Sequence, residues 1–395
     1  MRAGSAGPAR AVAVPRPAAG RQAGQCLRLW LRAGVGAMLA LAAGTRRHAV
    51  HGVLLAMALA GGGPATAAER PGAETAAERA ARVPLWPGDA PGPAAAGRER
   101  IVERSDDAAR PDRIITDVRQ PYLVVYRPPR PSGSALLVAP GGGYARIVLD
   151  KEGTALVPAF AEQAGVTLFV LRYRLPGADR ADAATAAVRD QPLADAQRAL
   201  RLIRARAAEF GVDPKRIGAL GFSAGGHVAA SLGTRYDERV NPPRDAIDRL
   251  SARPDFLLLV YPVIDMGAGT AAHTGSRLRL LGRHPDAATM DAYSLQNRVH
   301  AAMPPTFLLH AQDDTVVPVE NSLLFYQALR RAGVPSELHL FARGGHGFGT
   351  RGTAGLPVAA WPTLALDWMR ALQRDLAAAA PIAAPAAAAP APARP

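Results

Sequence analysis

A serine flanked by glycines is the first candidate for chemistry in this sequence. The stretch RIGALGFSAGGHVAASLG (216–233) contains the pattern G-x-S-x-G, with Ser223 between Gly221 and Gly225. The apolar run before the serine predicts a buried strand, and the run after it predicts a helix. A tight turn from strand to helix needs glycines, because a Cβ at either position would strike the neighbouring backbone. Such a turn presents the hydroxyl beside a helix N-terminus, where the Ala224 N–H faces developing negative charge.

A serine hydroxyl becomes a useful nucleophile when a neutral imidazole takes its proton and a carboxylate fixes the tautomer of that imidazole. Both groups follow in the order Ser, Asp, His that this turn predicts. Asp314 comes just after the apolar run TFLLHA (306–311), and His346 lies in the glycine-rich sequence GGHGFG. We therefore predict Ser223 as nucleophile, Asp314 as acid and His346 as base.

Two other aspartates are alternative candidates for the acid. Asp265 also follows an apolar run, and Asp313 differs from Asp314 by one step of the same loop. The spacing D-x-x-V-P, formed by Asp314, Val317 and Pro318, resembles the acid turn of hydrolases that carry this serine turn and favours Asp314. Asp313 is then expected to make hydrogen bonds within the loop.

The other histidines after residue 200 are weaker candidates for the base. His227 falls on the helix after the serine, while His310 and His339 fall inside predicted strands, where a packed or hydrogen-bonded role is expected. Three more lie in the stretch 263–300, where a role in a lid stays open: His273, His284 and His300.

Three glycines after the run SALLVAP (134–140) are the candidates for an oxyanion hole. Glycine lets the backbone approach a substrate and turn its N–H inward, which suits Gly142 and Gly143, and Tyr144 beside them is a candidate substrate contact. As a phosphate-binding loop, the stretch lacks the lysine of G-x-x-x-x-G-K-[ST] and the spacing of G-x-G-x-x-G. The sequence has no H-E-x-x-H and no other histidine pair at ligand spacing, so we predict no metal and no cofactor.

The elements that must position these residues follow from the hydrophobic pattern. Helical stretches separate six continuous apolar runs, and this alternation predicts an α/β fold with a mostly parallel sheet covered by helices on both faces. Sites in such sheets lie at the carboxyl ends of the strands. The predicted strands are 134–140, 166–175, 216–222, 255–262, 306–311 and 336–342, with edge strands at 114–118 and 122–126. The predicted helices are 152–164, 192–210, 224–232, 319–332 and 361–376.

Composition narrows the function classes. The chain has 395 residues, 49% of them hydrophobic, which is ample for the core of a large α/β domain. More than half of the formal net charge of +14 comes from eight arginines in residues 1–67, where no acidic residue offsets them. No basic helix or aromatic-basic alternation follows, which argues against nucleic-acid binding. Cys26 is the single cysteine, so no disulfide or thiolate chemistry is expected after this segment.

The stretch TRRHAVHGVLLAMALAGGGPATAAE (45–69) has arginines, a short apolar run and then Ala65-Thr66-Ala67, the layout of a secretory signal cleaved near Ala67. The apolar run is too short for a permanent membrane anchor. We therefore expect a periplasmic or secreted protein. The two arginines of this stretch weakly resemble a twin-arginine export signal, and Met38 is an alternative start of translation. A disordered extension on a cytoplasmic protein is the competing interpretation.

The predicted organisation has four parts. Residues 1–67 form the signal-type segment, 68–82 a linker, 83–376 the catalytic α/β domain, and 377–395 an Ala/Pro tail that does not pack. Within the domain, the stretch 263–300 lacks a strong period and is predicted to be a short cap insertion over the site.

From Leu85 to about Leu376 the chain resembles the α/β-hydrolase family of bacterial acetyl esterases, especially its acetylxylan-esterase-like and lipase-like members. The matching stretches include PLWPGDAPG, APGGGY followed by KEG, LRYRLP, GFSAGGH, HAQDDTVVPVE and GGHGFG. The resemblance implies Ser223, Asp314 and His346 as the catalytic residues, and Gly142, Gly143 and Ala224 as the oxyanion donors. Pro140 stands where hormone-sensitive-lipase-like relatives carry a histidine, which leaves the glycines of the hole in place.

The resemblance also implies a function. The implied function is hydrolysis of short-chain acyl esters, such as the O-acetyl groups of xylan, by a serine carboxylesterase through an acyl-serine intermediate. The expected partner is a small-molecule or oligosaccharide ester, with no nucleic acid and no permanent membrane anchor. The alternatives are a peptidase or lipase of the same fold, or a non-catalytic binding protein that kept the scaffold.

Overall fold

The computed structural model describes residues 69–94, 97–176 and 185–379 of the chain. The predicted signal segment 1–67 and residues 380–395 of the predicted tail lie outside the described residues. The last helix, α9 (Trp361–Ala379), extends three residues beyond its predicted end.

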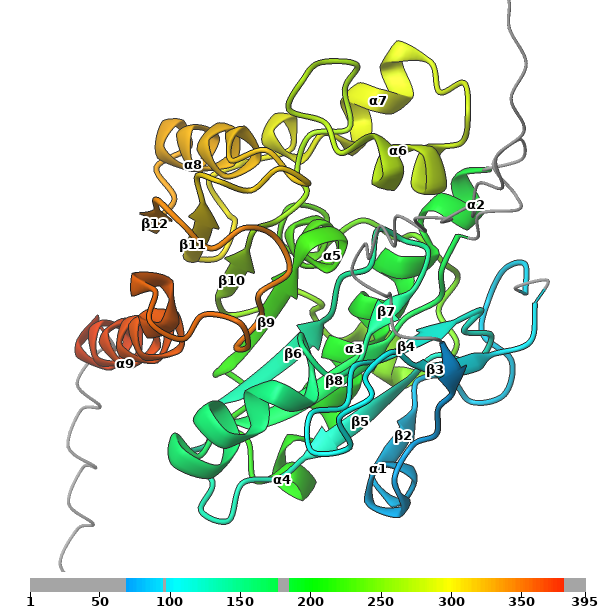
Figure 1. Cartoon of the computed structure of the whole chain (residues 1–395), viewed down its shortest axis with the longest axis vertical. Coiled ribbons are helices and arrows are strands. Elements are labelled where there is room, and N and C mark those ends of the chain that lie inside the picture. The colour runs from blue at the N-terminus through cyan, green and yellow to red at the C-terminus, as the bar shows by residue number, and fades with distance from the viewer. Residues whose placement is uncertain (1–68, 95–96, 177–184, 380–395) are drawn as a thin grey trace, which may run out of the picture. The chain divides into compact units, whose positions relative to one another are not determined.

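A twisted sheet of eight strands forms the centre of the domain (Figure 1). The strands from β12 to β8 run parallel, and β5 and β2 pair antiparallel at one edge, which confirms the predicted α/β class. In spatial order they are β12 (Ser336–Phe341), β11 (Thr306–Ala311), β10 (Leu257–Val260), β9 (Ile217–Phe222), β6 (Ala135–Ala139), β8 (Thr167–Arg172), β5 (Tyr122–Tyr126) and β2 (Arg82–Pro84). Each of the six predicted core strands is therefore present.

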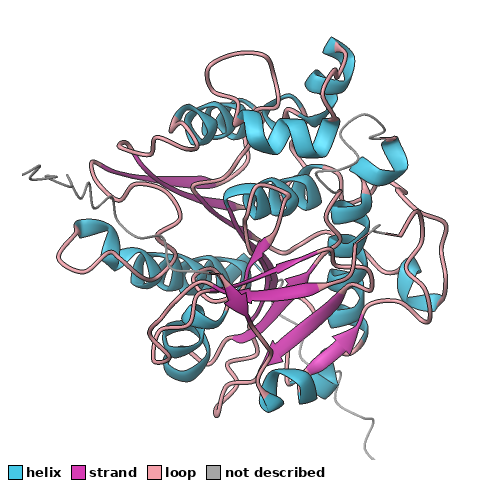
Figure 2. Ribbon diagram, turned by 45° about the vertical axis from the view of Figure 1, so that its right-hand side comes forward, coloured by secondary structure: helices cyan, strands magenta, loops and turns pink. Residues whose placement is uncertain are grey.

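Helices cover both faces of this sheet (Figure 2). One face carries α3 (Gln191–Ala205), α5 (Ser223–Thr234) and α8 (Glu320–Arg331), and the other carries η2 (Val157–Gln163) and α9. The shorter helices are α1 (Ala76–Ala80), η1 (Thr154–Leu156), α2 (Ala186–Arg189), α4 (Ala207–Phe210), η4 (Ala246–Arg249), α6 (Thr274–Leu281), α7 (Ala287–Tyr293), η5 (Leu295–Asn297) and η6 (Pro357–Ala360).

The predicted helical stretch 152–164 is present as a short 3₁₀ helix, η1, followed by a π-helix, η2, and not as a regular α-helix. Pro158 accounts for the difference, because it has no N–H to donate to the preceding turn and its ring clashes with the carbonyl four residues earlier.

The pleat of the strands explains why they are continuously apolar. Leu136 and Val138 of β6 pack in one core layer with Phe160, whereas Leu137 between them packs in the opposite layer with Leu200 of α3. Successive side chains of a strand point to opposite faces, so a strand buried on both faces must be apolar at every position. The carboxyl ends of these strands all meet at one edge of the sheet, where the site lies.

The predicted edge strands need correction. Residues 122–126 form β5, but β2 pairs outside it, so β5 is not an edge. Residues 113–116 form β4, which belongs to a second, four-stranded antiparallel sheet with the order β1 (Arg70–Pro71), β3 (Arg100–Glu103), β4 (Arg113–Thr116) and β7 (Ile147–Val148). Short apolar runs carry no information about the sheet that they join.

The predicted linker 68–82 is also wrong, because it contains β1 and α1 and packs against the domain. Glu78 of α1 is buried and pairs with Arg113 of β4 at 2.8 Å, and Arg113 in turn pairs with Asp150 at 2.8 Å. Arg82 contacts the Tyr122 ring at 4.3 Å. The stretch is held by these few polar contacts and not by a periodic row of apolar side chains. Its sequence therefore resembles that of a linker.

Among the described residues, no helix is both long enough and apolar enough to cross a membrane.

Candidate active site

The junction between β9 and α5 places Ser223 on a strained corner. Ser223 has φ +52°, in the left-handed region that residues other than glycine rarely adopt. A Cβ at Gly221 would meet the Gly225 carbonyl oxygen, and a Cβ at Gly225 would meet the carbonyl oxygens of Ala139 and Pro140. The predicted need for glycine on both sides of the serine is therefore a packing requirement of this turn.

The three predicted catalytic residues form a chain of two hydrogen bonds, with His346 in the middle. Ser223 Oγ lies 2.9 Å from His346 Nε2, and His346 Nδ1 lies 2.7 Å from Asp314 Oδ2. Asp314 follows the carboxyl end of β11, and His346 lies in the loop after β12. With the Nδ1 proton donated to the carboxylate, Nε2 has a free lone pair to accept the serine proton. This geometry suits nucleophilic attack by Ser223.

The Asp314 carboxylate is held on both of its oxygens. The backbone N–H groups of Val316 and Val317 each donate to Oδ1 at 2.9 Å, while His310 Nε2 lies 3.3 Å from Oδ2. Burial alone would raise the pKa of Asp314, but the hydrogen bonds from His310 and His346 outweigh burial and hold that pKa well below its usual range. The acid is therefore ionised and oriented.

The rival aspartates have other partners. Asp313 accepts hydrogen bonds from the N–H groups of Gly344 at 2.9 Å and Gly345 at 2.7 Å, so it orders the loop that carries His346. Asp265 accepts from Ser294 Oγ at 3.1 Å and from Gln296 Nε2 at 2.9 Å. The structure thus brings Asp314, and not Asp265 or Asp313, to the imidazole.

The remaining histidines differ in their surroundings. His227 Nδ1 bonds to the Tyr144 hydroxyl at 2.8 Å and Nε2 to the Tyr293 carbonyl at 2.8 Å, and burial lowers the pKa of His227 to about 4. His310 is buried in β11 against Ser322. His284, His300 and His339 do not line the cavity beside Ser223.

The glycine loop after β6 lies beside the serine, as predicted for oxyanion donors. Gly142 has φ +129° and Gly143 has φ +64°, and both line the same cavity as Ser223. The Gly142 carbonyl accepts a hydrogen bond from Ala145 N at 3.1 Å, which fixes its peptide within the loop. Ala224 stands in the first turn of α5, where backbone N–H groups have no acceptor within the helix. Two of the predicted donors, Gly142 and Gly143, therefore line the same cavity as Ser223, and the third, Ala224, follows Ser223 in the chain.

Tyr144 occupies a different place from the predicted one. Its side chain is buried, bonds to His227 and does not line the cavity. With φ +61° it ends the glycine loop and attaches that loop to α5. The structure therefore gives Tyr144 an anchoring contact and no contact with the cavity.

Glu152 is a further residue of the site, and the motifs around it in the sequence do not predict it. It is buried, lines the cavity and accepts hydrogen bonds from Gly141 N at 2.6 Å and from the Tyr261 hydroxyl at 3.0 Å. Burial raises the pKa of Glu152, although these two hydrogen bonds oppose the effect. The signal available in the sequence was the KEG stretch of the family resemblance, which contains this glutamate.

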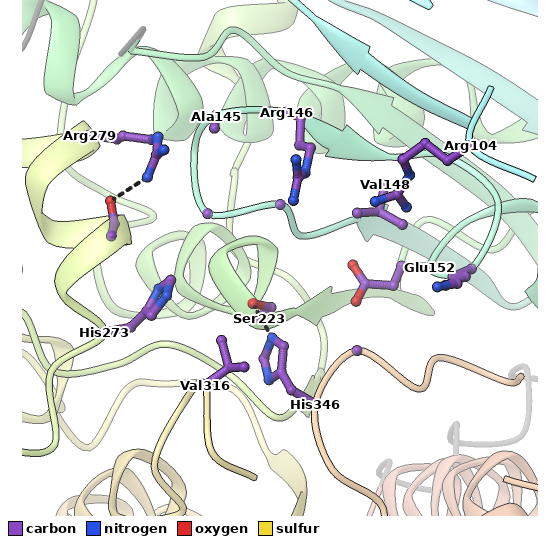
Figure 3. A pocket seen from close by; sticks show the side chains of 15 residues that line it. Arg104, Ala145, Arg146, Val148, Glu152, Ser223, His273, Arg279, Val316 and His346 are labelled. Carbon is purple, nitrogen blue, oxygen red and sulfur yellow. Dashed lines mark hydrogen bonds between the residues drawn. The ribbon is translucent and has the colours of Figure 1, made fainter. Parts of the chain in front are cut away.

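A cavity of about 400 Å³ opens at these groups (Figure 3). Its wall includes His273 and Arg279, which come from the stretch 263–300 that was predicted to cap the site. His273 directly precedes α6 as its N-cap, and its Nδ1 lies 2.8 Å from Ser276 Oγ. Burial lowers the pKa of His273, and the neighbouring His346 and Arg279 side chains lower it further. The insertion therefore forms part of the wall of the cavity.

In the described part of the chain, no group of three or more His, Cys, Asp or Glu side chains is arranged to hold a metal ion.

Comparison with known proteins places this arrangement in a family. The BD-FAE family model matches residues 125–329, which include the glycine loop, Ser223 and Asp314. The chain belongs to the BD-FAE family. The match ends before His346, which the structure brings to Ser223 from the following segment.

Individual relatives of this BD-FAE family protein are esterases and xylan-active proteins. The chain is 38% identical over 213 residues to the endo-1,4-beta-xylanase B of Butyrivibrio fibrisolvens, covering 54% of this chain and 32% of that protein. It is 33% identical over 239 residues to the acetylxylan esterase of Xylanibacter ruminicola, covering 60% of this chain and 45% of that protein. The chain thus spans less than half the length of these two relatives.

A solved structure matches over nearly its whole length. The acetyl ester-xyloside bifunctional hydrolase of Caldicellulosiruptor lactoaceticus is 36% identical, with a TM-score of 0.60, and the match covers 74% of this chain and 96% of that one. Together with the sheet order and the serine turn, this similarity confirms the predicted α/β-hydrolase fold and the resemblance to acetyl esterases.

Proposed function

We propose that this BD-FAE family protein is a serine carboxylesterase that hydrolyses short-chain acyl esters, in particular O-acetyl groups on carbohydrates such as xylan. The observation that carries the proposal is the chain of hydrogen bonds from Ser223 Oγ to His346 and on to Asp314. Ser223 and His346 line a cavity together with the glycine loop. A strained serine, an oriented imidazole and backbone donors are the parts that acyl transfer requires.

The geometry leads to a two-step reaction. Ser223 Oγ attacks the ester carbonyl carbon while His346 Nε2 takes the hydroxyl proton, and the N–H groups of the glycine loop and Ala224 stabilise the oxyanion. Collapse breaks the bond to the alcohol, which leaves with the proton from His346, and an acyl-serine remains. Water then attacks the acyl-serine by the same route and releases the carboxylic acid. Asp314 stays ionised and stabilises the imidazolium in both steps.

The lining of the cavity favours a short acyl group on a polar alcohol over a long-chain lipid ester. Among the residues that the structure describes, the apolar side chains in the wall are those of Ala145, Val148 and Val316, and the others that line it are glycine, polar or charged. A long acyl chain needs a broad apolar surface, because its burial supplies the binding free energy. The names of the acetylxylan esterase and acetyl ester-xyloside hydrolase relatives support an acetylated sugar as substrate.

Substrate comparison tests this proposal. We expect the purified protein to hydrolyse p-nitrophenyl acetate faster than the butyrate and much faster than the octanoate, and to release acetate from acetylated xylan. Ser223→Ala should abolish both activities while leaving the thermal unfolding transition in place. Failure to hydrolyse the acetate ester, or a preference for the octanoate, would contradict the proposal.

We also propose that the protein is exported to the periplasm or secreted. The support is the stretch 45–69, with its arginines, short apolar run and small residues before Ala67. N-terminal sequencing of protein purified from the expressing cell should find the new terminus near Ala67 or Ala68. An intact N-terminus on cytoplasmic protein would overturn this part.

A further inference from the structure

One wall of the cavity is strongly basic. Arg104, Arg146, Lys151 and Arg279 all line it. In Figure 3, Arg146 lies between Arg279 and Arg104 along one side, with Ser223 and His346 opposite. These four residues, called here the basic wall, come from separate segments: Arg104 follows β3, Arg146 and Lys151 flank β7, and Arg279 belongs to α6.

A single carboxylate, that of Asp112, pairs with two of the four cations of the basic wall. Asp112 pairs with Arg104 at 2.9 Å and with Lys151 at 3.4 Å. The pocket carboxylate Glu152 already accepts hydrogen bonds from a backbone amide and a tyrosine hydroxyl. Two cations facing the cavity therefore depend on other partners.

Arg146 and Arg279 are those two cations. Within the described residues, neither guanidinium forms an ion pair with a carboxylate. Arg279 Nη1 donates to the Gly275 carbonyl at 3.2 Å, and its buried Nε has no hydrogen-bond partner. Arg279 lines the cavity without a carboxylate partner among the described residues, so its guanidinium is suited to an acidic group that arrives with a ligand.

The electrostatics point the same way. Burial, followed by the charges of Arg104 and Arg279, lowers the pKa of Arg146, with Glu69 and Asp112 offsetting part of the effect. The like charges of Arg104, Arg146 and Arg279 repel one another, and an anion placed between them relieves that repulsion. Guanidinium groups also match the geometry of a carboxylate, because they can donate two parallel hydrogen bonds.

We propose that Arg146 and Arg279 bind a carboxylate of the substrate, so that the preferred ester carries an acidic group close to the scissile acyl group. This inference rests on the proposed esterase function. The carboxylate has two possible sources: a uronic acid substituent on an acetylated oligosaccharide, or the free acid of a dicarboxylic half-ester on the acyl side.

The test measures the ratio of kcat/KM for an acidic ester to kcat/KM for a matched neutral ester. A general loss of activity lowers both values and leaves this ratio unchanged. For the alcohol side, acetylated xylo-oligosaccharides with a glucuronic acid substituent are compared with neutral ones of the same length. For the acyl side, p-nitrophenyl hemisuccinate is compared with p-nitrophenyl butyrate. We expect the wild type to favour the acidic member of one pair about tenfold or more, and the pair that shows the preference identifies the source. This preference should shrink as salt rises.

Variants connect the preference to the two arginines. Arg146→Gln and Arg279→Gln should each reduce the ratio several-fold, and the double variant should bring it to about one. Arg330→Gln is the matched control, because Arg330 is exposed on α8 and does not line the cavity. It should keep the wild-type ratio. Thermal unfolding of each variant checks that it is folded.

Two outcomes overturn the inference: equal use of acidic and neutral esters by the wild type, or an acidic preference that survives in a folded double variant. Hydrolysis of p-nitrophenyl acetate by the same preparations separates these outcomes from failure of the esterase proposal. If that neutral ester is hydrolysed and the ratios are close to one, the esterase proposal stands and the carboxylate site is rejected.

Discussion

The Glu152 carboxylate accepts a hydrogen bond from the Gly141 amide at 2.6 Å, which joins a buried acid to the glycine loop beside Ser223. Its other oxygen accepts from the Tyr261 hydroxyl at 3.0 Å, and the same hydroxyl accepts from Gly349 N at 2.9 Å. Gly349 lies three residues after His346. One buried carboxylate therefore connects the loop of the oxyanion donors to the loop of the catalytic histidine.

Glu152→Gln should lower kcat about 10- to 100-fold with little change in KM. The glutamine has one acceptor oxygen, so it cannot keep both hydrogen bonds, and misplaced backbone donors lose stabilisation that is used mainly in the transition state. Steady-state kinetics on p-nitrophenyl acetate measures the effect. Tyr261→Phe is the control, because it leaves the contact of Glu152 with Gly141 and should lower kcat less. A Glu152→Gln kcat within twofold of wild type would exclude this positioning role.

Gly142→Ala and Gly143→Ala form a matched pair in the oxyanion loop. A Cβ at Gly142 would collide with the Arg146 carbonyl oxygen, whereas a Cβ at Gly143 would meet nothing closer than His273 Cε1 at 3.8 Å. Both positions have positive φ: an alanine at Gly143 (φ +64°) adds about 1 kcal/mol of strain, and an alanine at Gly142 (φ +129°), where almost only glycine is found, adds about 1 to 3 kcal/mol. We expect Gly142→Ala to lose about 10²- to 10³-fold in kcat, and Gly143→Ala to lose much less. Equal losses would show that collision with Arg146 does not matter.

The pH profile should show that Asp314 does not titrate in the working range. Hydrogen bonds from His310 and His346, acting against burial, hold the pKa of Asp314 well below its usual range. The acid therefore stays charged, and log(kcat/KM) should fall toward low pH with a slope of one, as the single base His346 takes up a proton. Asp314→Asn should lower kcat by about 10³- to 10⁴-fold. A slope of two in the wild type would indicate that a second group, such as Asp314, is protonated together with the base.

Glu78 makes a pH-dependent contribution to stability. Burial would raise its pKa, but hydrogen bonds from Arg113 and Thr75 lower it from 4.5 to about 2 in the folded chain. A carboxyl group with a depressed folded pKa stabilises the fold above its unfolded pKa and loses that contribution as pH falls through its folded pKa. The pH-dependent contribution is about 3 kcal/mol near neutral pH and disappears between about pH 5 and pH 2.

Urea unfolding of Glu78→Gln across this range measures that contribution. The difference in free energy of unfolding from wild type should be largest near pH 7 and should shrink as the pH falls toward 2. Glu209→Gln is the control, because Glu209 is exposed and its pair with Arg206 is a surface ion pair, so it should show no comparable pH dependence. A Glu78→Gln difference that does not change with pH would disprove the linkage.

The sequence was sufficient for the sheet, the serine turn and the triad, because each has a local signature. Continuous apolar runs predict strands buried on both faces, and glycines at 221 and 225 are required by the close packing of one turn. The order Ser223, Asp314, His346 follows from the sheet topology, since the carboxyl ends of β9, β11 and β12 lie at the same edge.

The sequence was insufficient where the contacts are polar and long-range. Glu152 gains its role from Gly141 and Tyr261, and its own neighbours in sequence do not indicate that pairing. The Glu78 to Arg113 pair orders a stretch that resembles a linker, because one buried charge leaves no periodic pattern. Tyr144 was expected in the cavity from its position beside the glycines, but the left-handed backbone there turns its side chain toward His227.

Covalent labelling of Ser223 tests the central claim most directly. A serine-directed organophosphate should inactivate the protein in step with the formation of one adduct, and peptide mass spectrometry should place that adduct on Ser223. Ser223→Ala should remain unlabelled and inactive. Labelling at another residue, or ester hydrolysis that continues in fully treated protein with Ser223 unmodified, would contradict the proposed mechanism.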